Sequence, residues 1–103
     1  MELLGPFGNV RAKSMFGGYG IFKDELMFGL VADDTFYLKA DDVNRTDFEA
    51  RDLERFVYYK KGKPMYLSYY QAPEEALDNS GDMLAWAEKS FAAAIRSGTK
   101  KRA

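Results

Sequence analysis

Two tight polar turns divide residues 15–40 into three segments with the character of β-strands. The first turn covers residues 23–25 and the second covers residues 33–34. After the second turn, residues 35–40 alternate apolar and polar side chains, a period of two that is typical of a half-exposed strand. Turns this short join antiparallel neighbours, because a parallel connection needs about a dozen residues or more. The pattern therefore predicts a three-stranded antiparallel meander.

The second half of the chain predicts a short helix followed by two more strands. Asp41 and Asp42 favour a helix start, and residues 43–51 follow with Val43 and Ala50 on the expected buried side and Phe48 beside it. Two strands are expected after this helix, and a lysine-rich turn joins them. They cover residues 56–59 and 65–70.

A longer helix is expected at the end of the domain. Asn79 or Ser80 is its predicted cap, and Asp82 suits its first turn. Arg96 and Gly98 are typical of a helix end. One apolar stripe at helical spacing contains Leu84, Ala87, Phe91, Ala94 and Ile95.

These elements predict a two-layer α+β domain with a five-stranded antiparallel sheet and the order (α)βββαββα. The bracketed helix is a short one at residues 3–4, which Gly5 and Pro6 would stop. A chain of 103 residues, 47% of them apolar, has the size of one hydrophobic core. We expect residues 1–98 to form this domain and residues 99–103 to form a basic, flexible tail.

The amino-acid composition limits the kinds of catalysis and metal binding that the chain can support. The chain has no cysteine and no histidine, so disulfides, thiolate catalysis and the commonest general base and metal ligand are absent. Composition thus makes an enzyme less favoured, but it does not forbid one that is built on carboxylates, tyrosine or lysine. We expect no enzyme, no catalytic residues, no metal and no cofactor. The apolar runs are shorter than the ~20 residues that cross a bilayer, and no signal peptide opens the chain, so a cytoplasmic protein without membrane contact is expected.

The short motifs that resemble ligand sites have structural interpretations. Gly17, Gly18 and Gly20 precede a strand instead of opening a helix, so we interpret them as structural glycines and not as a phosphate loop. The carboxylate pairs at residues 33–34, 41–42 and 74–75 match turns and helix caps and lack the spacing of a metal loop.

Two basic clusters raise nucleic-acid binding as an alternative. Arg11 and Lys13 precede the first strand, and Lys60, Lys61 and Lys63 lie at a hairpin turn among tyrosines. Cations and aromatic rings together can hold a phosphate backbone and stack bases. The isoelectric point of the chain is about 5.4. Nucleic-acid-binding domains usually have an isoelectric point above ~9, so this value opposes strong nucleic-acid binding.

An ordered series of motifs carries a resemblance to a known family. It comprises Arg11-x-x-Ser14-Met15-Phe16-Gly17-Gly18-Tyr19-Gly20-Ile21-Phe22, Met27 to Asp33, Tyr37-Leu38-Lys39, Asn44-Arg45-x-x-Phe48-Glu49-Ala50, Phe56-x-Tyr58, Tyr69-Tyr70-x-Ala72-Pro73-Glu74-Glu75-x-Leu77 and Trp86. The series spans residues 3–97 and resembles the N-terminal domain of the TfoX/Sxy family. The resemblance implies a five-stranded α+β fold similar to secretion chaperones. It also implies a regulator of natural competence that promotes transcription with the cyclic-AMP receptor protein, with a second, C-terminal domain and no established catalytic residues.

The resemblance and the composition favour a non-enzymatic regulatory module that binds a protein partner, with the transcription machinery as a candidate. The expected partner-binding residues are Tyr58, Tyr59, Tyr69, Tyr70 and Trp86. The alternatives are nucleic-acid binding through the two basic clusters, and a small-molecule or enzyme pocket near residues 17–20. An edge strand at residues 65–70 could also pair two copies into a homodimer.

Overall fold

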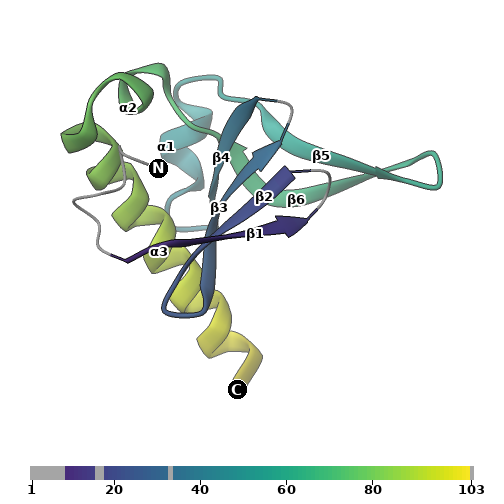
Figure 1. Cartoon of the computed structure of the whole chain (residues 1–103). Helices are drawn as coiled ribbons and strands as arrows, with labels where there is room; N and C mark the ends of the chain where they lie inside the picture. The colour runs from purple at the N-terminus through teal and green to yellow at the C-terminus, as the bar shows by residue number, and fades with distance from the viewer. Residues whose placement is uncertain (1–8, 16–17, 33, 103) are drawn as a thin grey trace.

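The computed structural model describes residues 9–15, 18–32 and 34–102. They form a single antiparallel sheet with helices packed against it (Figure 1). The strands are β1 (Arg11–Met15), β2 (Gly18–Lys23), β3 (Leu26–Ala32), β4 (Thr35–Lys39), β5 (Arg55–Lys60) and β6 (Lys63–Gln71). The helices are α1 (Arg45–Glu49), α2 (Glu74–Asp78) and α3 (Ser80–Arg102). The α+β class and the antiparallel meander are confirmed.

The sheet has six strands and not the expected five. The expected first strand is divided, because β1 is a strand of its own that pairs with β2 and places Met15 opposite Gly18. The side chains of residues 11–14 are all exposed on an edge strand, so they lack the apolar alternation that would reveal a strand. The short helix expected at residues 3–4 lies outside the described residues.

The strand at residues 65–70 was expected at an edge of the sheet, and this expectation is wrong. The observed strand order is β1-β2-β3-β4-β6-β5. β6 lies between β4 and β5, so the edges are β1 and β5. Of the length of β6, β4 reaches only the inner end, from Tyr69 to Gln71. β5, in contrast, pairs with β6 out to Lys63. Among the described strands, residues 63–66 therefore pair with β5 alone, and the outer half of the hairpin is a two-stranded ribbon.

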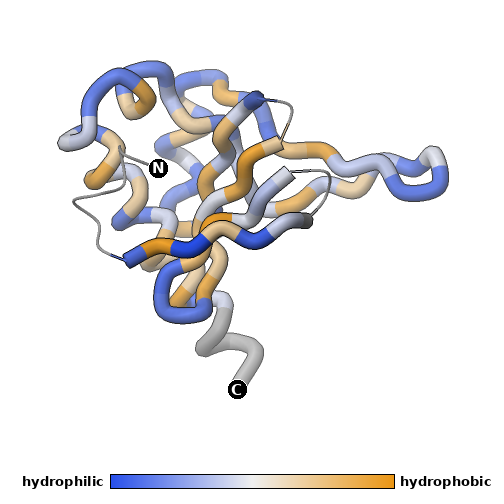
Figure 2. The backbone as a smooth tube through the Cα atoms, in the orientation of Figure 1, coloured by the Kyte–Doolittle hydropathy of each residue, from blue (hydrophilic) through white to orange (hydrophobic). Residues whose placement is uncertain are grey.

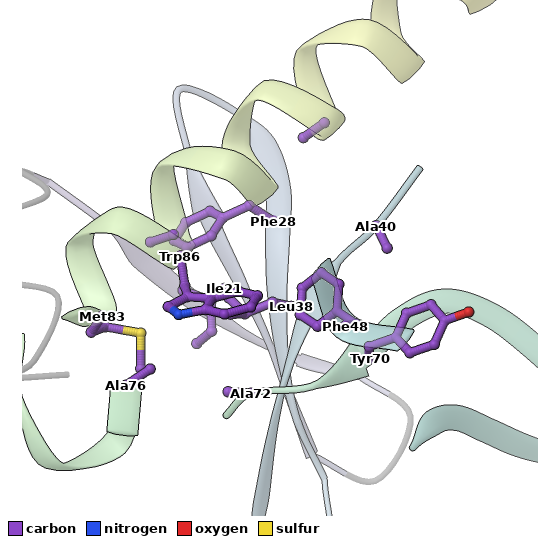
Figure 3. Close-up of a cluster of buried hydrophobic side chains, with 12 residues drawn as sticks. Ile21, Phe28, Leu38, Ala40, Phe48, Tyr70, Ala72, Ala76, Met83 and Trp86 are labelled. Atoms are coloured by element: carbon purple, nitrogen blue, oxygen red, sulfur yellow. The ribbon is translucent and has the colours of Figure 1, made fainter. Parts of the chain in front are cut away.

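An aromatic group joins the helices to one face of the sheet (Figure 3). Phe48 of α1 is fully buried, and its ring centroid lies 5.3 Å from Tyr70 of β6 and 5.2 Å from Trp86 of α3. Val43 was expected on the buried side of α1, but it is 67% exposed, and Ala50 is exposed as well. The helix starts later than expected, so its single turn directs Phe48 to the core instead.

The helix ends confirm one expected cap and differ from expectation in two other places. The Asn79 side chain caps α3, because its Oδ1 accepts hydrogen bonds from the backbone N–H groups of Gly81 and Asp82. α3 continues past Arg96 and Gly98 to Arg102 instead of ending near them. α2 was not expected; it begins after Pro73, whose fixed φ suits a helix start.

The buried face of α3 is shifted from the expected stripe. Ala87 and Ala94 are buried as predicted, but Ile95 is exposed and Leu84 and Phe91 are only partly buried. Met83, Trp86, Ser90 and Ala93 of α3 are buried as well. Among the described residues, no helix is both long and apolar enough to cross a lipid bilayer.

A second apolar cluster forms without any helix. Leu30, Ala32, Phe56 and Tyr69 are buried there, and Met27, Tyr37, Tyr58 and Leu67 pack against them. All eight belong to strands, whereas residues of all three helices join the other cluster. The described helices therefore pack on one face of the sheet (Figure 1). The second cluster occupies the opposite face, which no described helix covers and which we call the helix-free face.

Replacing Phe48 tests which side of α1 carries the packing. We expect Phe48→Ala to lower the free energy of unfolding by about 3–5 kcal/mol, because it opens a cavity where three elements meet. Val43→Ala should change it by less than about 0.5 kcal/mol, as for most exposed positions. Urea unfolding followed by tryptophan fluorescence measures both. Equal effects at the two positions would contradict this description of the core.

Candidate functional site

The outer part of the β5–β6 hairpin projects away from the rest of the fold (Figure 1). Lys60 pairs with Lys63, and Lys61 and Gly62 form the turn, both with positive φ values of 53° and 78°. Two successive residues with positive φ are the mark of a type I′ turn, whose twist suits a tight hairpin. Figure 2 shows the hydrophilic tip that results. The local sequence thus builds a narrow, protruding ribbon.

The ribbon carries different side chains on its two faces. Tyr58 lies opposite Met65 in the register, and both belong to the helix-free face, where Tyr58 packs on the second cluster. The alternation of a strand then places Tyr59 and Tyr66 on the opposite face. Tyr59 is 69% exposed, Tyr66 is 61% exposed and Met65 is 48% exposed. Large apolar side chains exposed together are typical of interaction surfaces.

The hairpin is also strongly basic. Residues 55–73 contain Arg55, Lys60, Lys61 and Lys63 but no carboxylate, in a chain whose net charge is −1. All three lysines are exposed, and none forms an ion pair within the described part of the chain. The Arg55 guanidinium lies 5.8 Å from the Tyr66 ring centroid, and its Nε donates to the Leu67 carbonyl at 3.0 Å. Arg55 is thus held against the ring.

Three of the expected partner-binding residues are buried in the fold. Tyr69 is only 7% exposed; its hydroxyl donates to the Met27 carbonyl at 3.3 Å, and burial raises its pKa. Tyr70 is also buried, and its hydroxyl donates to a Glu49 carboxylate oxygen at 3.5 Å. Both residues lie on the inner end of β6, so neither side chain is exposed to a partner.

Trp86 is the third of these buried residues. Its ring packs against Phe48 inside the core. The Arg51 guanidinium and the Lys89 ammonium lie 5.2 Å and 5.1 Å from the ring centroid. Arg51 also pairs with Glu75, and Lys89 pairs with Asp47 at 3.2 Å. These contacts join three helices, so Trp86 has a structural position and not one on a free surface.

The two basic clusters lie on strands at opposite edges of the sheet. Arg11 and Lys13 belong to β1, whereas the three lysines lie on and beside the β5–β6 turn. Arg11 already pairs with Glu25 at 2.6 Å. The hairpin adds Arg55, which the sequence interpretation did not select, and places it against Tyr66, one of the tyrosines that surround the lysine turn in the sequence. The basic character of Arg55, directly before the predicted strand at residues 56–59, was the signal that would have found it.

Close packing of the backbone accounts for glycine at position 18, where a Cβ would lie 1.8 Å from the Val31 carbonyl oxygen. Gly20 is buried in β2, and Gly17 lies outside the described residues. No cluster of three or more carboxylates that could hold a metal occurs in the described ranges.

Asp41, the first residue of the carboxylate pair at residues 41–42, has the structural role expected at a helix start. Its Oδ1 accepts from the backbone N–H of Val43 at 3.0 Å and of Asn44 at 3.3 Å. Arg96 of α3 donates to both of its oxygens, at 2.5 Å and 2.8 Å. The Arg96 hydrogen bond, with help from the two backbone donors, lowers the pKa of Asp41 from 3.8 to about 2. Asp41 thus fastens the start of α1 to α3.

The fold and the hairpin define a small antiparallel α+β domain with one helix-covered face. Residues 2–94 match the model of the TfoX N-terminal domain, so the chain belongs to that family. It is 34% identical over 67 residues to DNA transformation protein TfoX1 of Aliivibrio fischeri, a match that covers 65% of this chain and 32% of that protein. It is 26% identical over 95 residues to Protein Sxy of Escherichia coli K12, covering 92% of this chain and 46% of that protein. The chain therefore spans less than half the length of both relatives.

The Asp41–Arg96 contact makes stability depend on acid pH. Because the folded-state pKa of Asp41 lies below the unfolded value, its contribution is present above about pH 4 and is lost as the pH falls toward about 2. We expect Asp41→Asn to lower the unfolding free energy by about 1–2 kcal/mol at pH 7, with the difference from the original chain shrinking below pH 4.

Asp42→Asn is the matched control for this change. Asp42 is more exposed, and among the described residues its one ion pair is with Arg45, at 3.0 Å on the same short segment. A small and salt-sensitive effect is therefore expected. Urea unfolding at a series of pH values measures both variants. A constant difference between Asp41→Asn and the original chain down to pH 2 would contradict the assignment.

Proposed function

We propose that this chain is a non-enzymatic regulatory module of natural competence that acts by binding a protein of the transcription machinery. Its membership of the TfoX N-terminal domain family supports a regulatory role. One relative is named a DNA transformation protein, which agrees with control of DNA uptake. The chain supplies no histidine and no cysteine for catalysis.

The helix-free face of the sheet is the surface on which we place the partner. The observation that carries this proposal is the second apolar cluster, which is built from strands alone and continues outward through Tyr58 to Met65 on the hairpin. A sheet face covered by no described helix presents partly exposed Met27, Tyr37 and Leu67 beside it. Apolar area of this kind gains free energy when a protein covers it.

A substitution at Met65 tests the regulatory function. The test protein is Protein Sxy with its matching region replaced by this chain, in a host that lacks its own relative, and the readout is transcription of DNA-uptake genes. We expect the chimera to activate transcription and Met65→Glu to abolish activation, because a buried carboxylate opposes docking. The unfolding temperature of the isolated chain should stay unchanged, since Met65 is exposed.

Val43→Glu is the matched control, since Val43 is an exposed apolar residue on the helical side. It should leave activation intact. A crosslinking amino acid at position 65 should also form an adduct with RNA polymerase or a transcription regulator, and one at position 43 should not. An inactive chimera, or equal loss at both positions, would contradict the proposal.

A further inference from the structure

The second face of the hairpin carries two tyrosine rings and one guanidinium group that the proposed protein contact does not use. Val57 lies opposite Tyr66 in the register and Tyr59 lies opposite Pro64, so Tyr59 and Tyr66 are diagonal neighbours on this face. Such neighbours lie roughly 7–8 Å apart between backbones, within reach of aromatic side chains. The Arg55 guanidinium lies over the Tyr66 ring. We name Arg55, Tyr59 and Tyr66 the ring face.

Three more cations stand at the hairpin tip, beyond the ring face, without a local counter-charge. Strand alternation places Lys60 and Lys63 on the face of Tyr58 and Met65, so the tip is basic on both sides. Lys60 and Lys63 close the hairpin and Lys61 forms its turn. No described ion pair involves them, and residues 55–73 contain no carboxylate that would neutralise them. Charge complementarity therefore favours a partner that carries several negative charges at short spacing.

We propose that the ring face and the three tip lysines bind single-stranded nucleic acid. Unpaired bases stack on Tyr59 and Tyr66, and the lysines contact phosphates of the same strand. Every base has an aromatic face, so this arrangement favours strand binding with little sequence preference. The proposal goes beyond the proposed function and does not rest on it.

The two exposed rings favour a nucleic acid over an acidic protein. A polyacidic segment would use the lysines but would gain little from Tyr59 and Tyr66, which remain 69% and 61% exposed. The two exposed rings also favour a single strand over a duplex, because bases inside a duplex are already stacked on each other. The projecting ribbon allows a strand to reach both the rings and the tip (Figure 1).

Binding of a fluorescein-labelled oligothymidine to this chain tests the proposal by fluorescence anisotropy. We expect saturable binding at low salt, with a slope of log affinity against log salt of about −2, as for three phosphate contacts on a single strand. Replacing Lys60, Lys61 and Lys63 together by glutamine should weaken binding at least about tenfold and bring the slope near zero.

The rings are tested separately from the charges. Tyr59→Ala with Tyr66→Ala should weaken binding by about tenfold or more while the salt slope is retained, because stacking is lost and the phosphate contacts remain. Tyr59→Phe with Tyr66→Phe keeps both rings and should bind like the original chain. Both pairs are exposed positions, so circular dichroism should show the same fold.

Two further variants localise the site. Lys13→Gln removes an exposed cation from the opposite edge strand, and Met65→Glu changes the other face of the ribbon. Lys13→Gln should leave binding unchanged. Met65→Glu should retain the ring dependence, which separates this proposal from failure of the protein contact.

Several results would overturn the proposal. They are absent binding at low salt, equal binding when both rings are removed, and loss with Lys13→Gln equal to that of the lysine triple variant. Duplex DNA binding more tightly than the oligothymidine would exclude the single strand. Polyglutamate of equal charge binding as tightly would assign the surface to an acidic protein.

Discussion

The rest of the structure depends on the packing of the Phe48 ring. The ring lies between Trp86 of the long helix and Tyr70 of the sheet, so one side chain joins two layers that are distant in sequence. The short helix that carries it has only one turn and could not form alone, because isolated helices of that length are unstable in water. Packing of Phe48 therefore fixes α1, and α1 in turn fixes the path from β4 to β5.

Charged groups secure this arrangement at its margin. Asp41 holds Arg96 from the start of α1, and Arg51 and Lys89 lie against Trp86 while pairing with carboxylates of other helices. These contacts hold the helices to one face of the sheet. The opposite face and the outer hairpin are then left to strand residues. One hairpin can therefore present an apolar face and an aromatic face to different partners, with a basic tip between them.

The sequence predicted the parts of the fold that local chemistry decides. Period-two alternation found the meander, the lysine turn found the hairpin, and Asn79 was a correct candidate cap. It missed β1 because an exposed edge strand such as Arg11–Met15 shows no apolar period. It placed Val43 inside because it began the helix at residue 43, whereas α1 begins at Arg45 and leaves Val43 exposed before it.

The candidate site depended on burial, which local pattern cannot supply. Tyr58, Tyr59, Tyr69 and Tyr70 have similar neighbours in sequence, yet pairing of β4 with the inner end of β6 buries the last two and leaves Tyr59 outside. The same long-range pairing decided that Arg11 and Lys13 sit at the edge opposite the hairpin.

Hydrogen exchange of the backbone amides, with and without oligothymidine, tests the central claim most directly. That claim is that a core fixed by helices on one face leaves the β5–β6 ribbon free for binding. The account predicts slow exchange in β3, β4 and the inner end of β6, and fast exchange at residues 59–66 that slows when the oligonucleotide is added. Exchange as slow at residues 59–66 as in β3, or oligonucleotide protection confined to β1, would contradict it.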